Sequence, residues 1–227
     1  MPAQAIGAQE FVGAAFSLQK MVRARDLTFE AVRRIAARIV PGTTEGRGDE
    51  IALEELTAMG MDRLWHRNVI RFGAGTLETF HGDFRPDYVL QANDIFFVDL
   101  GVVWDGHEGD AGETFVVGDD PEMAACADTA KALWHEVADR WKGGTGLTGQ
   151  ALYDFARDRA EALGWRLNWE VKGHRVSDFP HAIYKAGDLG DLDAPPTTGL
   201  WILEIQIAHP TRPIGAFYED LLVGDVG

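Results

Sequence analysis

The chain has 227 residues, of which 36 are acidic and 21 are basic, so its formal net charge is −15. Hydrophobic residues make up 46% of the chain, which is enough for a sizeable core and excludes global disorder. The acidic balance argues against a nucleic-acid or anionic-membrane partner, because both need a basic surface. A single cysteine, Cys126, excludes an intrachain disulfide framework and a cysteine-based zinc site.

The start of the chain has neither a basic segment nor a long apolar segment, so we expect no signal peptide. No apolar run reaches the length of about 18 residues that a transmembrane helix needs. The sequence therefore predicts a soluble, acidic, cytoplasmic protein.

The first half of the chain is predicted to begin with helices. Apolar residues recur at helical spacing over residues 10–40, which predicts one long helix or two helices joined near Asp26. The sequence Pro-Gly-Thr-Thr ends this stretch, and its last residue, Thr44, is expected to cap a second helix that ends near Gly60. Two β-rich segments follow, at residues 95–104 and 113–118.

The second half repeats this order. Pro121 opens a helical stretch that a glycine-rich turn ends, and Thr148 is expected to cap a helix that ends near Gly164. The capping threonine and the terminal glycine are 16 residues apart in both halves. Two β-rich segments again follow, at residues 200–208 and 216–223. We therefore predict one domain over residues 1–227, built from two repeats at about residues 10–118 and 121–223.

Two acidic residues lie inside the most apolar segments. Asp99 and Glu204 have hydrophobic neighbours on both sides, and a buried carboxylate is costly unless it is paired or binds a metal. Each segment then turns and returns with a second acid, Asp110 in the first case and Glu219 in the second. None of the 21 basic residues lies in these four segments. Two divalent cations would cancel the four charges, whereas the alternative is that the acids face solvent on half-exposed strands.

Several short motifs around these acids resemble one known family. Residues 93–101 read Asn-Asp-Ile-Phe-Phe-Val-Asp-Leu-Gly, residues 108–110 read Glu-Gly-Asp, and residues 114–118 read Thr-Phe-Val-Val-Gly. This pattern resembles the pita-bread metallopeptidases, which include methionine aminopeptidase, Xaa-Pro aminopeptidase and prolidase. The resemblance implies an α+β fold with two pseudo-symmetric halves, in which helices cover a curved, mainly antiparallel sheet.

The resemblance also implies a dinuclear metal centre whose ligands are Asp, Asp, His, Glu and Glu in chain order. Asp99 and Asp110 are 11 residues apart, as in the family, and His174 follows a glycine as the family's metal histidine does. The expected ligands are therefore Asp99, Asp110, His174, Glu204 and Glu219. The expected cofactors are two divalent metal ions, with manganese preferred and cobalt, iron or zinc as alternatives.

Three residues are expected to act on the substrate by the same resemblance. His81 lies 18 residues before Asp99, like the family histidine that contacts the scissile peptide. His181 lies 7 residues after His174, like the histidine that stabilises the tetrahedral intermediate. Glu204 would accept the proton of the attacking water. No role is expected for the other four histidines, His66, His107, His135 and His209.

The chain departs from the family pattern in two places near this centre. The family sequence Gly-His-Gly-Ile-Gly is Gly-His-Arg-Val-Ser at residues 173–177, so we expect larger side chains to line this segment. Phe217 occupies a position where Xaa-Pro aminopeptidases commonly carry an arginine. These changes leave the expected ligands intact and bear on substrate specificity.

The resemblance implies a dinuclear aminopeptidase or dipeptidase that hydrolyses the N-terminal peptide bond through a metal-bridged hydroxide. The Glu-Gly-Asp motif at residues 108–110 favours the Xaa-Pro type, whereas Phe217 counts against it. We expect a short peptide or small amide as substrate, no nucleic-acid or membrane partner, and, by family habit, a homodimer. Two alternatives stay open. One is a metal-dependent non-peptidase hydrolase or lyase acting on a small molecule, and the other is a non-catalytic binding module of the same fold.

Overall fold

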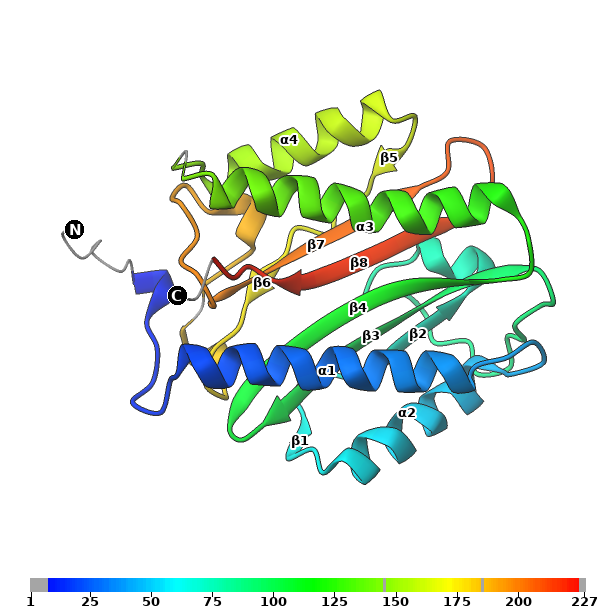
Figure 1. The fold of residues 1–227 in the computed structure, drawn as a ribbon, viewed down its shortest axis with the longest axis horizontal. Helices are drawn as coiled ribbons and strands as arrows, with labels where there is room; N and C mark the ends of the chain where they lie inside the picture. Colours follow the sequence, from blue (N-terminus) through cyan, green and yellow to red (C-terminus); the bar gives the residue numbers. More distant parts are fainter. Residues whose placement is uncertain (1–7, 145, 185, 225–227) are drawn as a thin grey trace.

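The computed structural model describes residues 8–144, 146–184 and 186–224. In this part of the chain, four α-helices pack against a single eight-stranded sheet (Figure 1). Its strand pairs are antiparallel, so the predicted α+β class is confirmed. The helices are α1 (Leu18–Arg38), α2 (Glu45–Met59), α3 (Pro121–Lys142) and α4 (Gly149–Ala162).

The sheet is built mainly from two long hairpins. The strands are β1 (Arg63–Leu64), β2 (Val69–Phe72), β3 (Asp94–Trp104), β4 (His107–Val117), β5 (Arg166–Leu167), β6 (His174–Arg175), β7 (Trp201–Ala208) and β8 (Gly215–Leu221). They follow the order β1-β3-β4-β8-β7-β5, with β2 also paired to β3 and β6 also paired to β7. The hairpins β3–β4 and β7–β8 therefore meet at the centre of the sheet, between β4 and β8.

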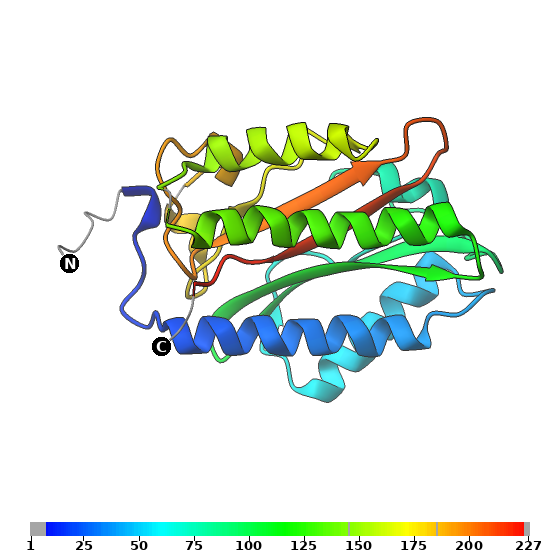
Figure 2. The ribbon, with the colours of Figure 1, turned by 45° about the horizontal axis from the view of Figure 1, so that its top comes forward.

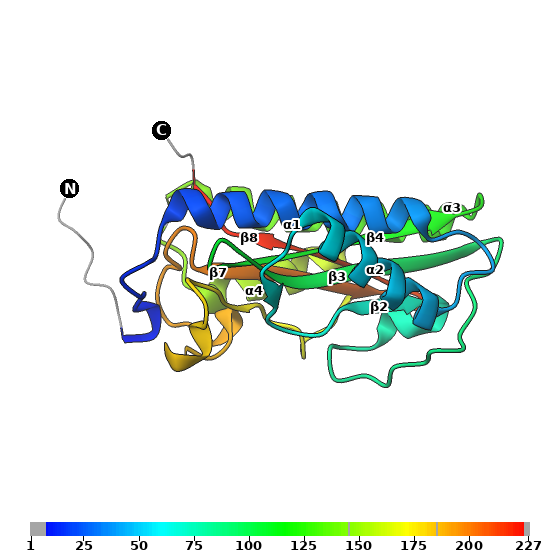
Figure 3. The same cartoon turned by 90° about the horizontal axis from the view of Figure 1, so that it is seen from below.

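Each half of the chain supplies two helices and one long hairpin. Helix α1 packs on β3 and β4, and α3 packs on β7 and β8, so both helices cross the same face of the sheet (Figure 2). Helix α2 packs beside α1, and α4 packs beside α3. Figure 3 shows α1 and α3 above the sheet, with loops from both halves below it. This is the predicted pseudo-symmetric arrangement.

The predicted helix caps are confirmed. The Thr44 hydroxyl accepts a hydrogen bond from the Arg47 backbone N–H at 3.1 Å, and the Thr148 hydroxyl accepts one from the Ala151 N–H at 3.1 Å. Gly60 ends α2 with a positive φ of 80°, a conformation that glycine adopts without a steric penalty. These ends follow from local sequence, because a capping side chain satisfies the first free N–H groups of its own helix.

The predicted start of the first helix was wrong. Helix α1 begins after Ser17 rather than at residue 10, and it continues through Asp26 without a joint. The reason is Glu10, which is buried and accepts hydrogen bonds from the Thr197 N–H at 2.8 Å and from the Trp201 indole N–H at 2.7 Å. These bonds draw the segment before Ser17 toward the second half of the molecule.

The core lies between the helices and the sheet. Strand β3 is buried along its whole length, and Trp134 of α3 donates its indole N–H to the Leu203 carbonyl of β7 at 2.8 Å. Each fully buried large apolar side chain contributes roughly 1.5–3 kcal/mol relative to exposure, so this layer holds both hairpins against the helices. None of the helices in the described ranges combines the length and apolar character needed to cross a membrane.

The turn of the first hairpin is tighter than predicted. The predicted β-rich segments left residues 105–112 between them, but Trp104 already pairs with His107, which leaves only Asp105 and Gly106 in the loop. Both have a positive φ, 48° and 71°, as a two-residue Asp-Gly hairpin turn requires. Strand β4 therefore starts three residues before Asp110, and this acid lies well inside the sheet.

Candidate metal centre

A row of acids crosses the middle of the sheet. Asp99 pairs with Gly112 between β3 and β4, Gly112 pairs with Glu219 between β4 and β8, and Glu219 pairs with Glu204 between β8 and β7. Directly paired residues point to the same face of a sheet, so the three carboxylates share one face. Asp110 joins them, because side chains two residues apart on a strand point the same way.

Gly112 leaves the space that this row needs. A Cβ atom at this position would lie 2.9 Å from the Glu219 Oε1 atom and 2.6 Å from the Phe217 ring. Any larger residue would therefore push into the centre of the acidic row. The glycine lets acids from both hairpins approach each other across the junction of β4 and β8.

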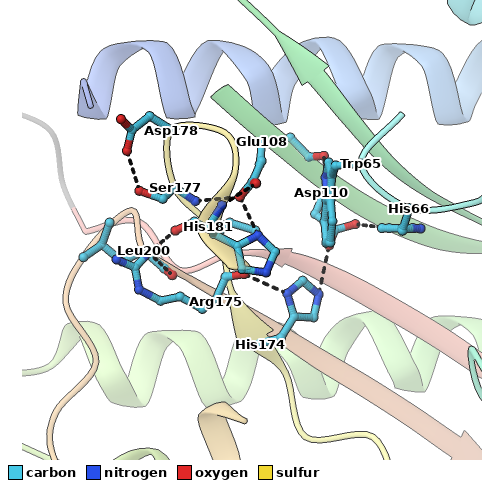
Figure 4. Close-up of polar contacts among 12 residues, drawn as sticks. Trp65, His66, Glu108, Asp110, His174, Arg175, Ser177, Asp178, His181 and Leu200 are labelled. Carbon is cyan, nitrogen blue, oxygen red and sulfur yellow. Dashed lines mark hydrogen bonds and ion pairs between the residues drawn. The ribbon is translucent and has the colours of Figure 1, made fainter. Parts of the chain in front are cut away.

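Two histidines lie against Asp110 (Figure 4). His174 Nε2 is 2.9 Å from Asp110 Oδ2, and His66 Nε2 is 3.4 Å from Asp110 Oδ1 and 3.7 Å from Asp99 Oδ1. Strand β6 places His174 by pairing it with Ile202, two residues before Glu204. One donor atom from each of Asp110, His174 and Glu219 can lie within 4.8 Å of the others, and the same holds for His66, Asp99 and Asp110.

Burial and mutual repulsion disturb three of the carboxylates. In the protein without bound metal, burial raises the pKa of Asp99 to about 6 and that of Glu204 to about 7. Burial, reinforced by the neighbouring acids, also raises the pKa of Glu219 well above its usual value. At pH 7 a carboxyl group with a pKa of about 7 is about half protonated, so a cation that binds Glu204 would have to displace a proton, whereas Asp99 is mostly ionised.

Asp110 behaves in the opposite way because of its two histidines. Burial alone would raise its pKa, but the hydrogen bonds and charges of His174 and His66 outweigh this and lower the pKa to about 2. Burial disfavours the charged histidines, yet Asp110 raises the pKa of His174 to about 10 and that of His66 to about 9. The acid and the two imidazoles thus form one charged group inside the site.

The donor set fits divalent cations. Within the described residues, Asp99 Oδ1 and Glu219 Oε1 are buried and accept no hydrogen bond. A buried carboxylate oxygen is rarely left without a partner, and a divalent cation would supply one to both. Carboxylate oxygens combined with imidazole nitrogens suit manganese, iron, cobalt or zinc.

The acids line a cavity of about 320 Å³. All five predicted ligands contribute to its wall, and so do His81 and His181, so the structure brings every predicted site residue to one place. One side of the cavity is apolar and consists of Val69, Phe97, Val171 and Phe217. The rings of Phe97 and Phe217 are 5.3 Å apart. Phe217, the residue at the position of the family arginine, therefore lies in the cavity wall beside Phe97.

The altered segment after His174 does not line this cavity. The buried Arg175 donates to the Gln9 carbonyl at 3.1 Å and to the Phe11 carbonyl at 2.8 Å, and it therefore fixes the segment that precedes α1. Ser177 donates its hydroxyl to Asp178 at 2.8 Å. The larger side chains expected in this segment therefore bond to the surrounding chain and do not reach the cavity.

Two residues of the centre, Trp65 and His66, are not among the predicted site residues. Trp65 contacts three histidine rings, with centroids 4.4 Å from His66, 5.5 Å from His174 and 5.2 Å from His181. Nothing in their spacing marks Trp65 or His66, which follow the short strand β1. One signal was present at Gly101, which pairs with Asp110, because a Cβ there would lie 1.9 Å from the His66 ring.

Comparison with known proteins places this geometry in context. The sequence profile of metallopeptidase family M24 matches residues 19–193 of this chain. The methionine aminopeptidase of Aquifex aeolicus (strain VF5) is 22% identical over 178 residues, which cover 72% of this chain and 67% of that protein.

Two solved structures show the same fold. The X-Pro aminopeptidase of Thermotoga maritima MSB8 has a TM-score of 0.72 and 17% identity, covering 92% of this chain and 59% of the other. The methionine aminopeptidase of Thermotoga maritima has a TM-score of 0.71 and 17% identity, covering 92% and 96%. The chain thus spans about three fifths of the X-Pro aminopeptidase, and the predicted pita-bread fold is confirmed.

Proposed function

Because the chain belongs to metallopeptidase family M24, we propose that it is a metal-dependent aminopeptidase or dipeptidase that hydrolyses the N-terminal bond of short peptides. One observation carries the proposal. Two aspartates, one histidine and two glutamates converge on a single cavity, and two of the carboxylate oxygens lack a partner among the described residues. A purely structural cluster would have satisfied these oxygens with basic side chains or backbone N–H groups.

Asp99, Asp110, His174, Glu204 and Glu219 are the residues that would hold the metal. We propose two divalent ions, with manganese as the first candidate and cobalt, iron or zinc as alternatives. When bound, they supply Lewis acidity and an activated water at neutral pH. They also offset the burial and mutual repulsion that raise the pKa values of Asp99, Glu204 and Glu219 in the metal-free protein.

The chain's own residues would handle the substrate and the protons. Glu204 lines the cavity with a pKa of about 7, close to the value at which a carboxylate accepts and returns a proton efficiently near neutral pH. His181 would donate a hydrogen bond to the substrate carbonyl oxygen as negative charge develops there. His81, which lines the same cavity, would hold the scissile amide.

We propose an Xaa-Pro peptide as the preferred substrate. The apolar wall formed by Val69, Phe97, Val171 and Phe217 gives a rigid ring such as proline a surface to pack against. The structural likeness to an X-Pro aminopeptidase agrees with this preference. The wall departs from the Xaa-Pro pattern at Phe217, where Xaa-Pro aminopeptidases commonly carry an arginine.

A metal-reconstitution assay tests the proposal. The protein is stripped of metal with a chelator and reloaded separately with Mn²⁺, Co²⁺, Fe²⁺ or Zn²⁺. Each sample receives Xaa-Pro dipeptides and tripeptides, peptides with other N-terminal residues, and small amides and esters. We expect release of the N-terminal residue only after reloading, fastest with Xaa-Pro peptides.

Two variants and one control complete this assay. Asp110→Ala and Glu219→Ala should lose both bound metal and activity, whereas Glu113→Gln, on the same strand β4 but paired with Lys131, should retain both. Peptide hydrolysis that survives complete metal removal would overturn the proposal. Turnover of small amides or esters without peptide turnover would also overturn it, in favour of the non-peptidase alternative.

A further inference from the structure

Glu108 is a buried carboxylate outside the predicted ligand set. Its side chain is 1% exposed, and it lies two residues before Asp110 on β4, so both acids point to the same face of the sheet. A carboxylate this deeply buried needs partners for both oxygens. Within the described residues, Glu108 finds them in one short stretch, residues 177–181.

Four hydrogen bonds join Glu108 to this stretch, three through its side chain and one through its backbone N–H (Figure 4). Its Oε2 atom accepts from the Ser177 backbone N–H at 2.9 Å and lies 2.7 Å from the Nδ1 atom of the His181 ring. Its Oε1 atom accepts from the backbone N–H of His181 at 2.9 Å. The Glu108 backbone N–H donates to the Ser177 carbonyl at 3.0 Å. Glu108 therefore fixes both the main chain and the ring of His181.

These bonds determine which ring nitrogen of His181 faces the cavity. An ionised carboxylate only accepts hydrogen bonds, so the Nδ1 atom must carry the hydrogen. The Nε2 atom, on the other side of the ring, has no protein partner within the described residues, and the ring lines the cavity. The Trp65 ring meets it edge-on at 5.2 Å, and the His174 ring stacks beside it at 6.4 Å, so the ring has little freedom to turn.

We propose that Glu108 is a positioning residue: it accepts the Nδ1 hydrogen of His181 and so directs Nε2 at the substrate carbonyl, to which the ring donates once Nε2 also carries a hydrogen. The proposal rests on the proposed function, in which His181 acts on that carbonyl. Catalytic histidines depend on such a partner, because the wrong tautomer or a turned ring places the reacting nitrogen out of reach. Glu108 itself does not touch the substrate, and its effect on the reaction passes through the His181 ring.

The Glu108→Gln variant tests this role kinetically. An amide is uncharged and can present either its oxygen or its NH2 group to Nδ1, so it holds the Nδ1 hydrogen, and a ring with hydrogens on both nitrogens, less firmly than a carboxylate does. With the best peptide of the assay above, we expect kcat to fall about 10–100-fold at full metal content while KM stays nearly unchanged. Glu113→Gln, on the same strand, serves as the matched control and should keep the wild-type kcat. A wild-type kcat in Glu108→Gln would overturn the proposal.

A second measurement reads the hydrogen of the ring directly and does not depend on activity. Nitrogen-15 NMR of the wild-type protein loaded with diamagnetic Zn²⁺ identifies His181 by the signal that is lost in His181→Ala. We expect a hydrogen on Nδ1, and its loss in Glu108→Gln. A bare Nδ1 in the wild-type protein would overturn the positioning role. If no peptide is hydrolysed but Nδ1 carries its hydrogen, the proposed function fails while the Glu108–His181 contact stands.

Discussion

The hairpins β3–β4 and β7–β8 deliver acids to the same cavity but surround them differently. In the first hairpin, Asp110 lies between two histidines, which lower its pKa to about 2. In the second hairpin, burial raises the pKa of Glu204 to about 7 and that of Glu219 well above its usual value. The equivalent acids Asp110 and Glu219 therefore differ, the first with a lowered and the second with a raised pKa, whereas Asp99 and Glu204 both have raised pKa values of about 6 and about 7.

This difference in pKa indicates which acids can take part in proton transfer. An acid whose pKa lies near 2 holds its charge at any physiological pH and serves as an anchor. An acid whose pKa lies near 7 can accept and return a proton within one catalytic cycle. The asymmetry comes from the partners, His66 and His174, and not from the strands, which present their acids in the same register-determined way.

The largest effect is expected when the anchor is removed. Asp110→Asn leaves His66 and His174 without the carboxylate that compensates their buried charges. At pH 6 we expect the free energy of unfolding of the metal-free protein to fall by about 3 kcal/mol or more. Urea denaturation of matched metal-free samples measures this, with Glu113→Gln as the control. An unchanged unfolding free energy would show that the histidines do not depend on Asp110.

The stability of the metal-free protein should depend on pH through the same raised and lowered pKa values. Asp99 and Glu204 have raised folded-state pKa values of about 6 and 7, so their stabilising protons are lost as the pH rises through those values. His174 has a raised pKa of about 10, so its contribution is fully present below its unfolded value and is lost as the pH approaches 10. The contribution of Asp110 is constant above its unfolded value, because its folded-state pKa is lowered.

These contributions have the same sign above pH 5. We expect the metal-free protein to lose a few kcal/mol of unfolding free energy between pH 5 and pH 9. Metal affinity should change in the opposite direction and rise about tenfold per pH unit for each proton that the metal displaces. Urea denaturation at four pH values and metal titration at the same values measure the two trends. A metal-free protein that becomes more stable from pH 5 to pH 9 would contradict the raised pKa values.

A smaller effect of the opposite sign is expected in the second hairpin. Glu219→Gln removes a buried carboxylate that faces Asp99, Asp110 and Glu204. We expect the metal-free variant to be more stable than the wild type by about 1–2 kcal/mol at pH 8, because less repulsion is buried. Thermal unfolding with and without metal measures this, and the metal should stabilise the variant less. If Glu219→Gln and Asp110→Asn destabilise equally, the two hairpins do not differ in the way proposed.

The sequence predicted those parts of the site that are carried by local pattern. Asp99 and Glu204 could be recognised because an acid within an apolar strand has no local explanation. The returning acids Asp110 and Glu219 followed from the hairpin pattern. Thr44 and Thr148 could be recognised as caps because a cap bonds to its own helix. Each of these features depends on residues within one segment of chain.

The parts that were missed depend on pairing between distant segments. His66 reaches Asp110 only because β1 pairs with β3 and because Gly101 leaves room beneath its ring. Glu108 accepts hydrogen bonds from residues 177–181, which lie about 70 positions later in the chain. The error at the start of α1 has the same origin, because Glu10 bonds to Thr197 and Trp201. The periodicity and spacing of residues within one segment do not predict contacts between segments that are far apart in the sequence.

The smallest expected effect tests whether the two halves are equivalent outside the metal centre. Thr44→Ala and Thr148→Ala remove matching caps, each of which satisfies one backbone N–H at 3.1 Å. We expect each change to lower the unfolding free energy by about 1 kcal/mol and to leave metal affinity unchanged. Chemical denaturation and metal titration of both variants measure this. Equal losses would place the asymmetry of the molecule in the partners of its acids, whereas a much larger loss in one half would place it in the scaffold as well.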